Sequence, residues 1–461
     1  MTFERISSSY RDPSGFVFRR DGEILRQINQ SYRPQYECLL NSGLYQAAVE
    51  AQSLIAHQEV DEGLPEPENG WKIIRPKTVG FVSYPYEWSF SQLKDAALLT
   101  LEIQKQAMRH GMSLKDASAY NIQFDRGRPI FIDTLSFEQY EEGKPWVAYG
   151  QACRHFLAPL ALMSLRDVRL NQLLPANLDG VPLDLASKLL PVRSKLRLSL
   201  LVHLHLHAKM LARHSGSTQK PPRSRKLGKT QLLGIIEDLE SAIRRLNWKP
   251  GNTPWSDYYA NTSYSAAGMD QKLHFVARCI EEIAPKMIWD LGANTGEFSR
   301  LASQRGILTI AFDSDPATVE KNYLRVKREN EVNLLPLLMD LTNPSPSIGW
   351  DNRERMTLPE RGPADLVLAL ALVHHLAISG NVPLGRLADF LRRIARNLVI
   401  EFVPKSDPQA ERLLVVRKDI FADYTQEVFE LEFGRHFLIE RRESVPDSNR
   451  ILYRMTARNP A

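Results

Sequence analysis

The sequence is poor in several features that would place it in a specialised class of protein. Its three cysteines, Cys38, Cys153 and Cys279, are far apart and form no CxxC pair, so neither a disulfide scaffold nor a zinc site is expected. The first residues are polar and lack the apolar core of a signal peptide. The longest apolar run, residues 364–378, contains Asp365 and two histidines and is too short to span a bilayer. These absences favour a cytoplasmic protein without a membrane partner.

Charge is also nearly balanced. The 59 lysine and arginine residues against 54 aspartate and glutamate residues leave a net charge of +5, and no basic run is interleaved with aromatic residues. A nucleic-acid partner is therefore not expected. A chain of 461 residues exceeds one ordinary core, so two domains are expected, while the oligomeric state stays open.

One segment suggests where the two domains meet. Residues 215–229 are basic, rich in proline, glycine and serine, and poor in apolar residues, which is typical of a surface linker. We place a helix-rich α+β domain at 1–214, the linker at 215–230 and an α/β domain at 231–461. A tether for phosphate or nucleic acid is the alternative reading of the linker.

The most informative stretch is residues 287–298, MIWDLGANTGEF. It predicts a buried strand, a glycine-containing turn and the start of a helix, and a second strand at 308–313 ends on Asp313. Further strands are expected at 334–339, 365–370 and 397–402, alternating with helices as in a doubly wound parallel sheet. Segments 437–442 and 450–458 predict a closing antiparallel hairpin.

The spelling Asp-Leu-Gly-Ala-Asn-Thr-Gly resembles motif I of class I S-adenosylmethionine (SAM) methyltransferases, and the resemblance covers roughly residues 255–458. It implies a Rossmann-like sheet and SAM as the cofactor. The positions that it assigns to the cofactor are Asp290, Gly292, Asn294 and Gly296 around the methionine part, Asp313 at the ribose and Asp340 at the adenine. Asn294 replaces the middle glycine of the commoner spelling, and asparagine tolerates a positive φ better than most residues.

The candidate catalytic residues lie just beyond two later strands. His374 and His375 follow the fourth strand, and Glu401 ends the fifth. Histidine can accept a proton near neutral pH, whereas the alternatives are that a histidine packs against the sheet and that Glu401 only caps its strand. No metal site is expected here. The Asn-Pro pair of some amino-methylating enzymes is absent after strand four, which favours a small-molecule or glycan acceptor over a nucleic-acid base.

The first domain contains a second constellation, Asp116, Asn121 and Asp133, with strand-like segments between the last two. It resembles the catalytic loop and metal-binding acid of kinases, which implies Mg-ATP. No glycine-rich loop is recognisable, and Arg26 and Lys72 are only guesses for the nucleotide lysine. A kinase-like module without activity and ordinary turn contacts of Asp116 and Asn121 are the alternatives.

A run of three alternate histidines, His203, His205 and His207, lies in a segment of helical period. Alternate residues of a helix point in different directions, so packing roles are favoured over a shared metal.

The arrangement as a whole looks like methyltransferases related to nodulation-linked proteins of rhizobia. The resulting hypothesis is a two-domain SAM-dependent methyltransferase acting on a small molecule, a glycan or a secondary metabolite. Two other hypotheses are a kinase-like or bifunctional enzyme using Mg-ATP, and a SAM-binding scaffold without turnover.

Overall fold

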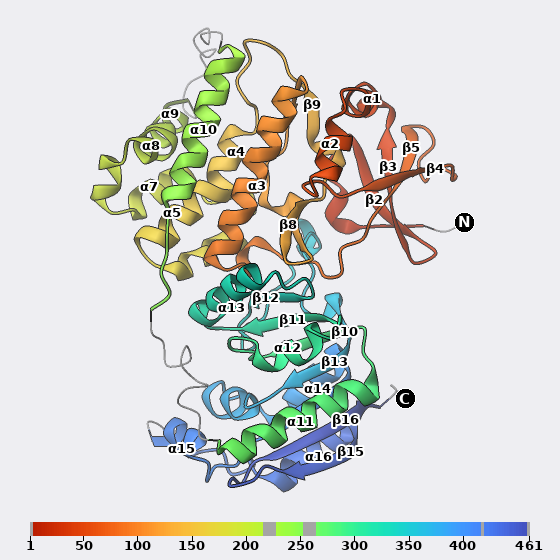
Figure 1. Ribbon diagram of the computed structural model, residues 1–461, viewed down its shortest axis with the longest axis vertical. Helices are drawn as coiled ribbons and strands as arrows, with labels where there is room; N and C mark the ends of the chain where they lie inside the picture. Colours follow the sequence, from red (N-terminus) through yellow and green to blue (C-terminus); the bar gives the residue numbers. More distant parts are fainter. Residues whose placement is uncertain (1–2, 215–226, 252–263, 416–418, 459–461) are drawn as a thin grey trace. The chain divides into compact units, whose positions relative to one another are not determined.

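The computed structural model describes residues 3–214, 227–251, 264–415 and 419–458. The chain divides into two compact units (Figure 1). The first comprises Met1–Lys249 together with Ile348–Arg355, and the second comprises Pro250–Ser347 and Met356–Ala461. No described helix is long and apolar enough to cross a membrane.

The N-terminal unit begins with a five-stranded antiparallel sheet in the order β1-β2-β3-β5-β4. A turn at Asp21 and Gly22, both at positive φ, joins β2 to β3 in an antiparallel hairpin. Two helices, α1 and α2, separate β3 from β4. The bounds of these elements are β1 Glu4–Arg5, β2 Gly15–Arg20, β3 Glu23–Asn29, α1 Arg33–Asn41, α2 Leu44–Glu50, β4 His57–Val60 and β5 Gly70–Pro76.

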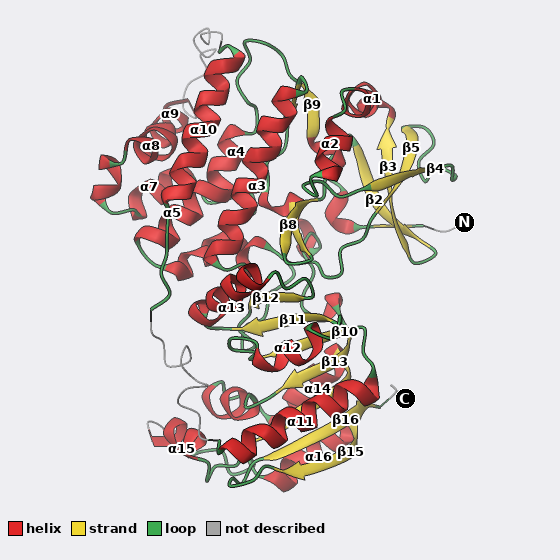
Figure 2. Cartoon of the chain, in the orientation of Figure 1, coloured by secondary structure: helices red, strands yellow, loops and turns green. Residues whose placement is uncertain are grey.

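Helices dominate the remainder of this unit (Figure 2). The long helix α3 (Phe90–Arg109) begins with a capping box, in which Ser89 and Gln92 satisfy each other's backbone N–H groups. Two short two-stranded antiparallel sheets follow: β6 pairs with β9, and β7 pairs with β8. Their bounds are β6 Met112–Leu114, β7 Ile122–Asp125, β8 Arg128–Phe131 and β9 Phe137–Gln139. The later helices are α4 Tyr149–Ala152, α5 Ala158–Leu165, α6 Leu173–Ala176, α7 Leu183–Leu189, α8 Leu198–Leu200, α9 His207–His214 and α10 Lys229–Arg245.

The boundary between the units differs from the expected one, because α10 belongs to the first unit rather than to the second. Its buried face, Leu232, Ile236, Leu239 and Ile243, lies on the side that packs against α3. Lys94 of α3 donates to the carbonyls of Arg244 and Leu246, and Lys105 pairs with Glu240 at 2.7 Å. The basic composition of 215–230 is thus a poor guide to the boundary, and residues 215–226 lie outside the described part of the chain.

The C-terminal unit contains a seven-stranded sheet in the order β12-β11-β10-β13-β14-β16-β15. The five strands from β10 to β14 are parallel, and β16 and β15 add the antiparallel hairpin that was predicted. The strands are β10 Met287–Leu291, β11 Leu308–Asp313, β12 Leu334–Leu338, β13 Ala364–Ala369, β14 Ala395–Phe402, β15 Phe437–Ser444 and β16 Ile451–Ala457. This order confirms the doubly wound α/β sheet, with its closing hairpin, that the sequence predicts.

One helix precedes this sheet in the sequence, and the others lie between its strands. They are α11 Ala266–Ile283, α12 Glu297–Ser303, α13 Pro316–Glu329, α14 Leu384–Ile394, α15 Pro408–Val415 and α16 Gln426–His436. Phe275, Val276 and Ile280 of α11 share one buried apolar cluster with Ile288 of β10 and Leu366 of β13. Because this cluster fixes α11 beside the first strand, it also positions the polar residues near the start of α11.

A short arm from the second half of the sequence belongs to the first unit. Residues 348–355, from the connection between β12 and β13, are held there chiefly through Glu354, which is only 4% exposed. Its carboxylate accepts from the Arg11 guanidinium at 2.6 Å, from the Tyr10 hydroxyl at 2.9 Å and from the backbone N–H of Trp350. Arg355 lies over the ring of Tyr120, 4.0 Å from its centroid.

Candidate active site

A cavity of about 410 Å³ opens in the C-terminal unit where β10, β11, β12 and β13 end. The carboxyl ends of parallel strands are the usual ligand position in such sheets. Six of the predicted site residues line it: Asp290, Gly292, Asn294, Asp313, Asp340 and His375. Gly296, His374 and Glu401 are not among its lining residues.

The turn after β10 has the backbone conformation that its sequence requires. The N–H groups of Gly292 and Ala293 both donate to the Phe312 carbonyl at 2.9 Å, which holds the turn against β11. Asn294 has a φ of 52°, so asparagine here fills a left-handed position, as expected. Gly296 begins α12 at a φ of 83°, and a Cβ there would lie 2.7 Å from the Asn322 amide. Gly296 therefore acts by shaping the turn.

Asp313 is oriented mainly by backbone N–H donors. Its two oxygens accept N–H bonds from Asn294 at 2.8 Å and from Asp315 at 2.9 Å, and each oxygen retains a further lone pair. Burial raises the pKa of this carboxyl. No cation is paired with it among the ion pairs of the described residues, so its charge is available to a ligand in the cavity.

The two other acids of the cavity differ in their surroundings. Asp290 is buried and accepts a hydrogen bond from the Ser299 hydroxyl at 2.6 Å, and burial raises its pKa to about 6. Asp340 is exposed, and one of its oxygens accepts from the backbone N–H and the hydroxyl of Thr342. Asp340 is thus oriented by its own turn, beside the mouth of the cavity.

The two histidines occupy different environments. His374 is 1% exposed, and its Nδ1 has no hydrogen-bond partner. His375 lines the cavity, with its ring centroid 4.1 Å from that of His374. Burial and the nearby Arg450 lower the pKa of His375 to about 4, so the imidazole is neutral at physiological pH. Of the two, His375 is the one able to accept a proton in the cavity.

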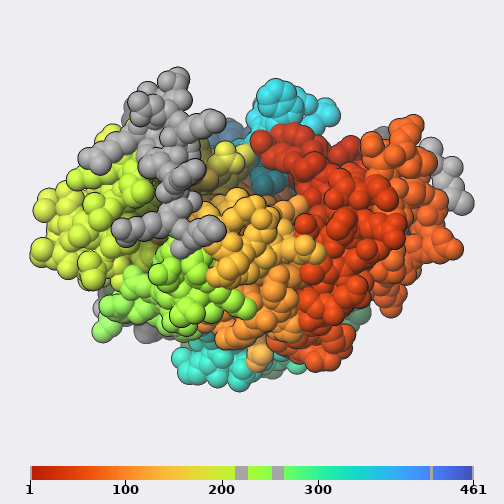
Figure 3. All heavy atoms as spheres, turned by 90° about the horizontal axis from the view of Figure 1, so that it is seen from above, coloured from red at the N-terminus to blue at the C-terminus, as the bar shows by residue number. Residues whose placement is uncertain are grey.

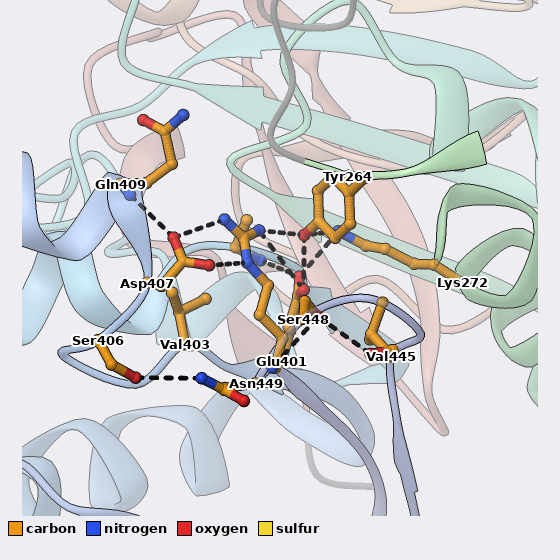
Figure 4. Close-up of polar contacts among 12 residues, drawn as sticks. Tyr264, Lys272, Glu401, Val403, Ser406, Asp407, Gln409, Val445, Ser448 and Asn449 are labelled. Atoms are coloured by element: carbon orange, nitrogen blue, oxygen red, sulfur yellow. Dashed lines mark hydrogen bonds and ion pairs between the residues drawn. The ribbon is translucent and has the colours of Figure 1, made fainter. Parts of the chain in front are cut away.

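Glu401 lies behind the cavity wall in a buried polar network (Figure 4). Its carboxylate accepts from the Tyr264 hydroxyl at 2.5 Å, from Lys272 at 2.7 Å and from the backbone N–H of Ala371 at 2.8 Å. Tyr264, Lys272 and Ala371 themselves line the cavity. Glu401 therefore fixes three cavity-lining groups in position.

Arg450 completes this network. Its guanidinium makes a two-pronged pair with Asp407, at 2.7 and 2.9 Å, and also donates to the Tyr264 hydroxyl. All four charged groups are at most 5% exposed, and two cations face two carboxylates. Burial would raise the pKa of Glu401, but Lys272 and Arg450 outweigh that effect and keep it below its usual value.

Sequence reasoning missed Lys272, Asp407 and Arg450. They lie on α11, before α15 and before β16, and no motif joins segments so far apart. Tyr264, which lies just before α11, also belongs to this network. A lysine on the otherwise apolar face of α11 was the one available signal.

The second constellation, Asp116, Asn121 and Asp133, lies in the N-terminal unit. Arg26 of β3 forms ion pairs with Asp133 and with Asp12. The Arg26–Asp12 distance is 3.0 Å. The two oxygens of Asp133 accept further bonds, from the Leu135 N–H at 2.9 Å and the Ser136 hydroxyl at 2.6 Å. Asn121 donates to the same Ser136 hydroxyl. Among the described residues, no group of three or more histidine, cysteine or acidic side chains is placed to hold a metal ion.

One known protein is similar to this chain over almost its whole length. The chain is 36% identical over 456 residues to the nodulation protein NoeA of Rhizobium meliloti strain 1021, a match that spans 97% of this chain and 95% of NoeA. The chain belongs to the NoeA family. No family model matches it.

Solved structures match parts of the chain only loosely. The magnesium protoporphyrin IX methyltransferase of Synechocystis PCC 6803, crystallised with S-adenosylhomocysteine, is 16% identical, with a TM-score of 0.31 over 41% of this chain and 84% of that one. The N-methyltransferase NodS of Bradyrhizobium japonicum WM9 is 13% identical, with a TM-score of 0.32 over 42% of this chain and 99% of that one. Likeness at this level assigns no residue a role.

The strand order, the turn after β10 and the acid that ends β11 give the C-terminal unit the Rossmann-like arrangement that the resemblance to class I SAM-dependent methyltransferases implies. The cavity fits this cofactor on its own chemistry. It offers Asp313 with both oxygens held and a lone pair on each, a turn without a Cβ at Gly292, and the buried acid Asp290. Its volume lies in the range of small-ligand pockets.

Proposed function

We propose that this protein transfers a methyl group from SAM to a small-molecule or glycan acceptor. The observation that carries the proposal is the convergence of Asp290, Asn294, Asp313 and His375 on one cavity. When bound, SAM supplies an activated methyl group on a sulfonium. The chain's own part is then to hold the donor, align the acceptor and accept a proton.

Each wall of the cavity has a role in this proposal. Asp313 would bind the two ribose hydroxyls, and Asp340 would contact the adenine. The turn at Gly292 and Asn294 would enclose the methionine part, near the carboxyl of Asp290. His375, neutral because of its lowered pKa, is our candidate general base. Glu401 and His374 would be positioning residues, because neither lines the cavity.

Calorimetric titration with S-adenosylhomocysteine tests the cofactor site. Asp313→Asn removes the charge but keeps the side-chain shape, and Asp389→Asn, on the exposed part of α14, is the matched control. Two hydrogen bonds to a charged acceptor are worth about 1.5–3 kcal/mol each. We therefore expect binding at least about 100-fold weaker in the first variant and unchanged in the second; equal binding by both would contradict this site.

The acceptor class needs a separate measurement. Full-length protein with tritiated SAM and a fractionated bacterial extract should label the small-molecule or glycan fraction. Label recovered only in nucleic acid would overturn the acceptor class while leaving the cofactor site intact. Normal cofactor binding with no transfer to any fraction would favour the scaffold hypothesis.

A finer proposal concerns the N-terminal unit, which we infer to be a kinase-like module without phosphotransfer. The meeting of Asp116, Asn121 and Asp133 near a β3 cation supports the kinase-like interpretation. The pairing of Asp133 with Arg26 argues against Mg²⁺ binding, since that carboxylate is already neutralised. Titration with Mg-ATP should give no heat, and heat that disappears in Asp133→Asn would restore the phosphotransfer alternative.

A further inference from the structure

A turn in the N-terminal unit exposes large apolar side chains next to cations. Residues 192–198 follow α7 and include the first residue of α8. Val192, Leu196 and Leu198 are 78%, 87% and 74% exposed. Between them Arg193, Lys195 and Arg197 are also exposed. Scattered single apolar residues are common on surfaces, but three within seven residues form a local concentration. We call residues 192–198 the basic apolar turn.

The basic apolar turn is held in this exposed form by its one buried residue. Ser194 donates to the Pro191 carbonyl at 2.7 Å, and its hydroxyl lies 2.9 Å from Nε2 of His205. Nδ1 of His205 lies 2.7 Å from the Ser187 hydroxyl of α7. The middle histidine of the alternating run thus links α7 to the turn. With Ser194 fixed inward, its apolar neighbours cannot all turn into the core.

The helical segment that follows the basic apolar turn also exposes apolar side chains. Val202, Leu206 and Met210 are exposed at four-residue intervals, which places them along one helical face. Leu200, Leu204 and Ala208 are buried on the other face. Figure 1 shows α7, α8 and α9 grouped at one side of the N-terminal unit, and Figure 3 shows this yellow-green part of the chain at the surface.

Charge in this part of the sequence is strongly one-sided. Residues 185–214 contain six lysine and arginine residues and not one aspartate or glutamate, although the whole chain has a net charge of only +5. An anionic partner is therefore favoured. Nucleic acid would use the cations but would gain little from exposed valine and leucine. The boundary between the headgroups and acyl chains of an anionic bilayer uses both kinds of side chain.

We propose that the basic apolar turn and the exposed face of the following helix dock on the surface of an anionic lipid bilayer. Val192, Leu196 and Leu198 enter the boundary between headgroups and acyl chains, and Arg193, Lys195 and Arg197 meet the lipid phosphates. The protein lies on the membrane and does not cross it. This inference is independent of methyl transfer.

Flotation of the full-length protein with lipid vesicles tests the proposal. The protein should float with phosphatidylcholine–phosphatidylglycerol vesicles and not with phosphatidylcholine alone. Each cation near an anionic surface contributes about a five-fold factor in partitioning, so the triple variant R193Q/K195Q/R197Q should bind about 100-fold more weakly. The double variant L196S/L198S keeps every charge and should also lose about ten-fold or more.

The matched control is L431S/L438S, which removes two leucines that are 58% and 52% exposed in the other unit. It should bind the anionic vesicles like the unchanged protein. All substitutions are at exposed positions, so each variant is expected to fold, and circular dichroism verifies this. Full binding by L196S/L198S would overturn the proposal and indicate a general polyanion site, such as one for RNA. Equal binding to neutral vesicles, or no binding to either kind, would also overturn it.

Discussion

The buried network around Glu401 gives a sharp prediction about stability. Glu401→Gln keeps the size of the side chain but removes one of two negative charges from a site with two cations. Lys272 and Arg450 then face only Asp407, so one positive charge is left uncompensated in a region at most 5% exposed.

The expected magnitude follows from this imbalance. Breaking one partner of a buried ion pair costs about 3–5 kcal/mol, mostly because the other charge remains buried. Lys272→Met alone should cost a similar amount, since it leaves the network with an excess negative charge. The double variant restores the balance, with Arg450 still paired to Asp407. We therefore expect its loss to be smaller than the sum of the two single losses by at least about 1.5 kcal/mol.

Hydrogen exchange in the full-length protein measures these losses of stability separately for each part of the chain. Peptides from β13, β14 and β16 should lose protection in each single variant and regain much of it in the double variant, while peptides from the N-terminal sheet stay unchanged. Glu411→Gln, at an exposed position of α15, makes the same chemical change and should stay within about 0.5 kcal/mol. A loss below about 1 kcal/mol for Glu401→Gln, or strict additivity in the double variant, would refute the reasoning.

Three further predictions concern single residues. Glu354 has its pKa lowered to about 2, although burial alone would raise it, because Arg11, the Trp350 N–H and Tyr10 stabilise its charged form. The stability that ionised Glu354 gives the first unit should be complete above pH 4.5 and should fall as the pH drops toward 2. Hydrogen-exchange protection of the first unit should therefore be lower in Glu354→Gln than in the unchanged protein near neutral pH, and the two should become equal in acid. Asn294→Gly should bind S-adenosylhomocysteine normally in calorimetry, whereas Asn294→Val should bind at least ten-fold more weakly, because a branched residue is strained at a φ of 52°; equal binding by both would contradict this. His375 should titrate near pH 4 by NMR and so make the fold less stable as the pH falls from 6.5 toward 4; a midpoint near 6.5 would exclude the buried, neutral imidazole.

Much of the cofactor half of the site could be predicted from the sequence because its constraints are local. The turn from Asp290 to Gly296 is specified by backbone conformation within seven residues, and only a few residue types accept a positive φ there. Asp313 follows from the next strand, because adjacent parallel strands end at the same edge. Local pattern and tertiary position therefore agree in this part of the chain.

The wall behind the cavity could not be predicted in this way. Lys272, Glu401 and Arg450 are separated by up to 178 positions and meet only because α11 and β16 both pack near β14. The end of the first unit was misplaced for a related reason. The composition of residues 215–230 is polar, which predicts a boundary there. The helix that follows, α10, nevertheless packs its apolar face against α3. This packing cannot be read from the sequence of either helix alone.

The two acids Asp313 and Asp133 show why a matching pattern does not by itself carry chemistry. Each ends a segment that resembles a nucleotide-binding motif, and each accepts hydrogen bonds at both oxygens. Asp313 is held by uncharged backbone N–H groups at the edge of a cavity, and burial raises its pKa, so a ligand can gain from its charge. At Asp133 burial acts in the same direction, but Arg26 outweighs it and lowers the pKa. A ligand at Asp133 would first have to displace a guanidinium, whereas the ion pairs of the described residues include no cation at Asp313. The chemistry of this chain is therefore expected at the edge of the seven-stranded sheet.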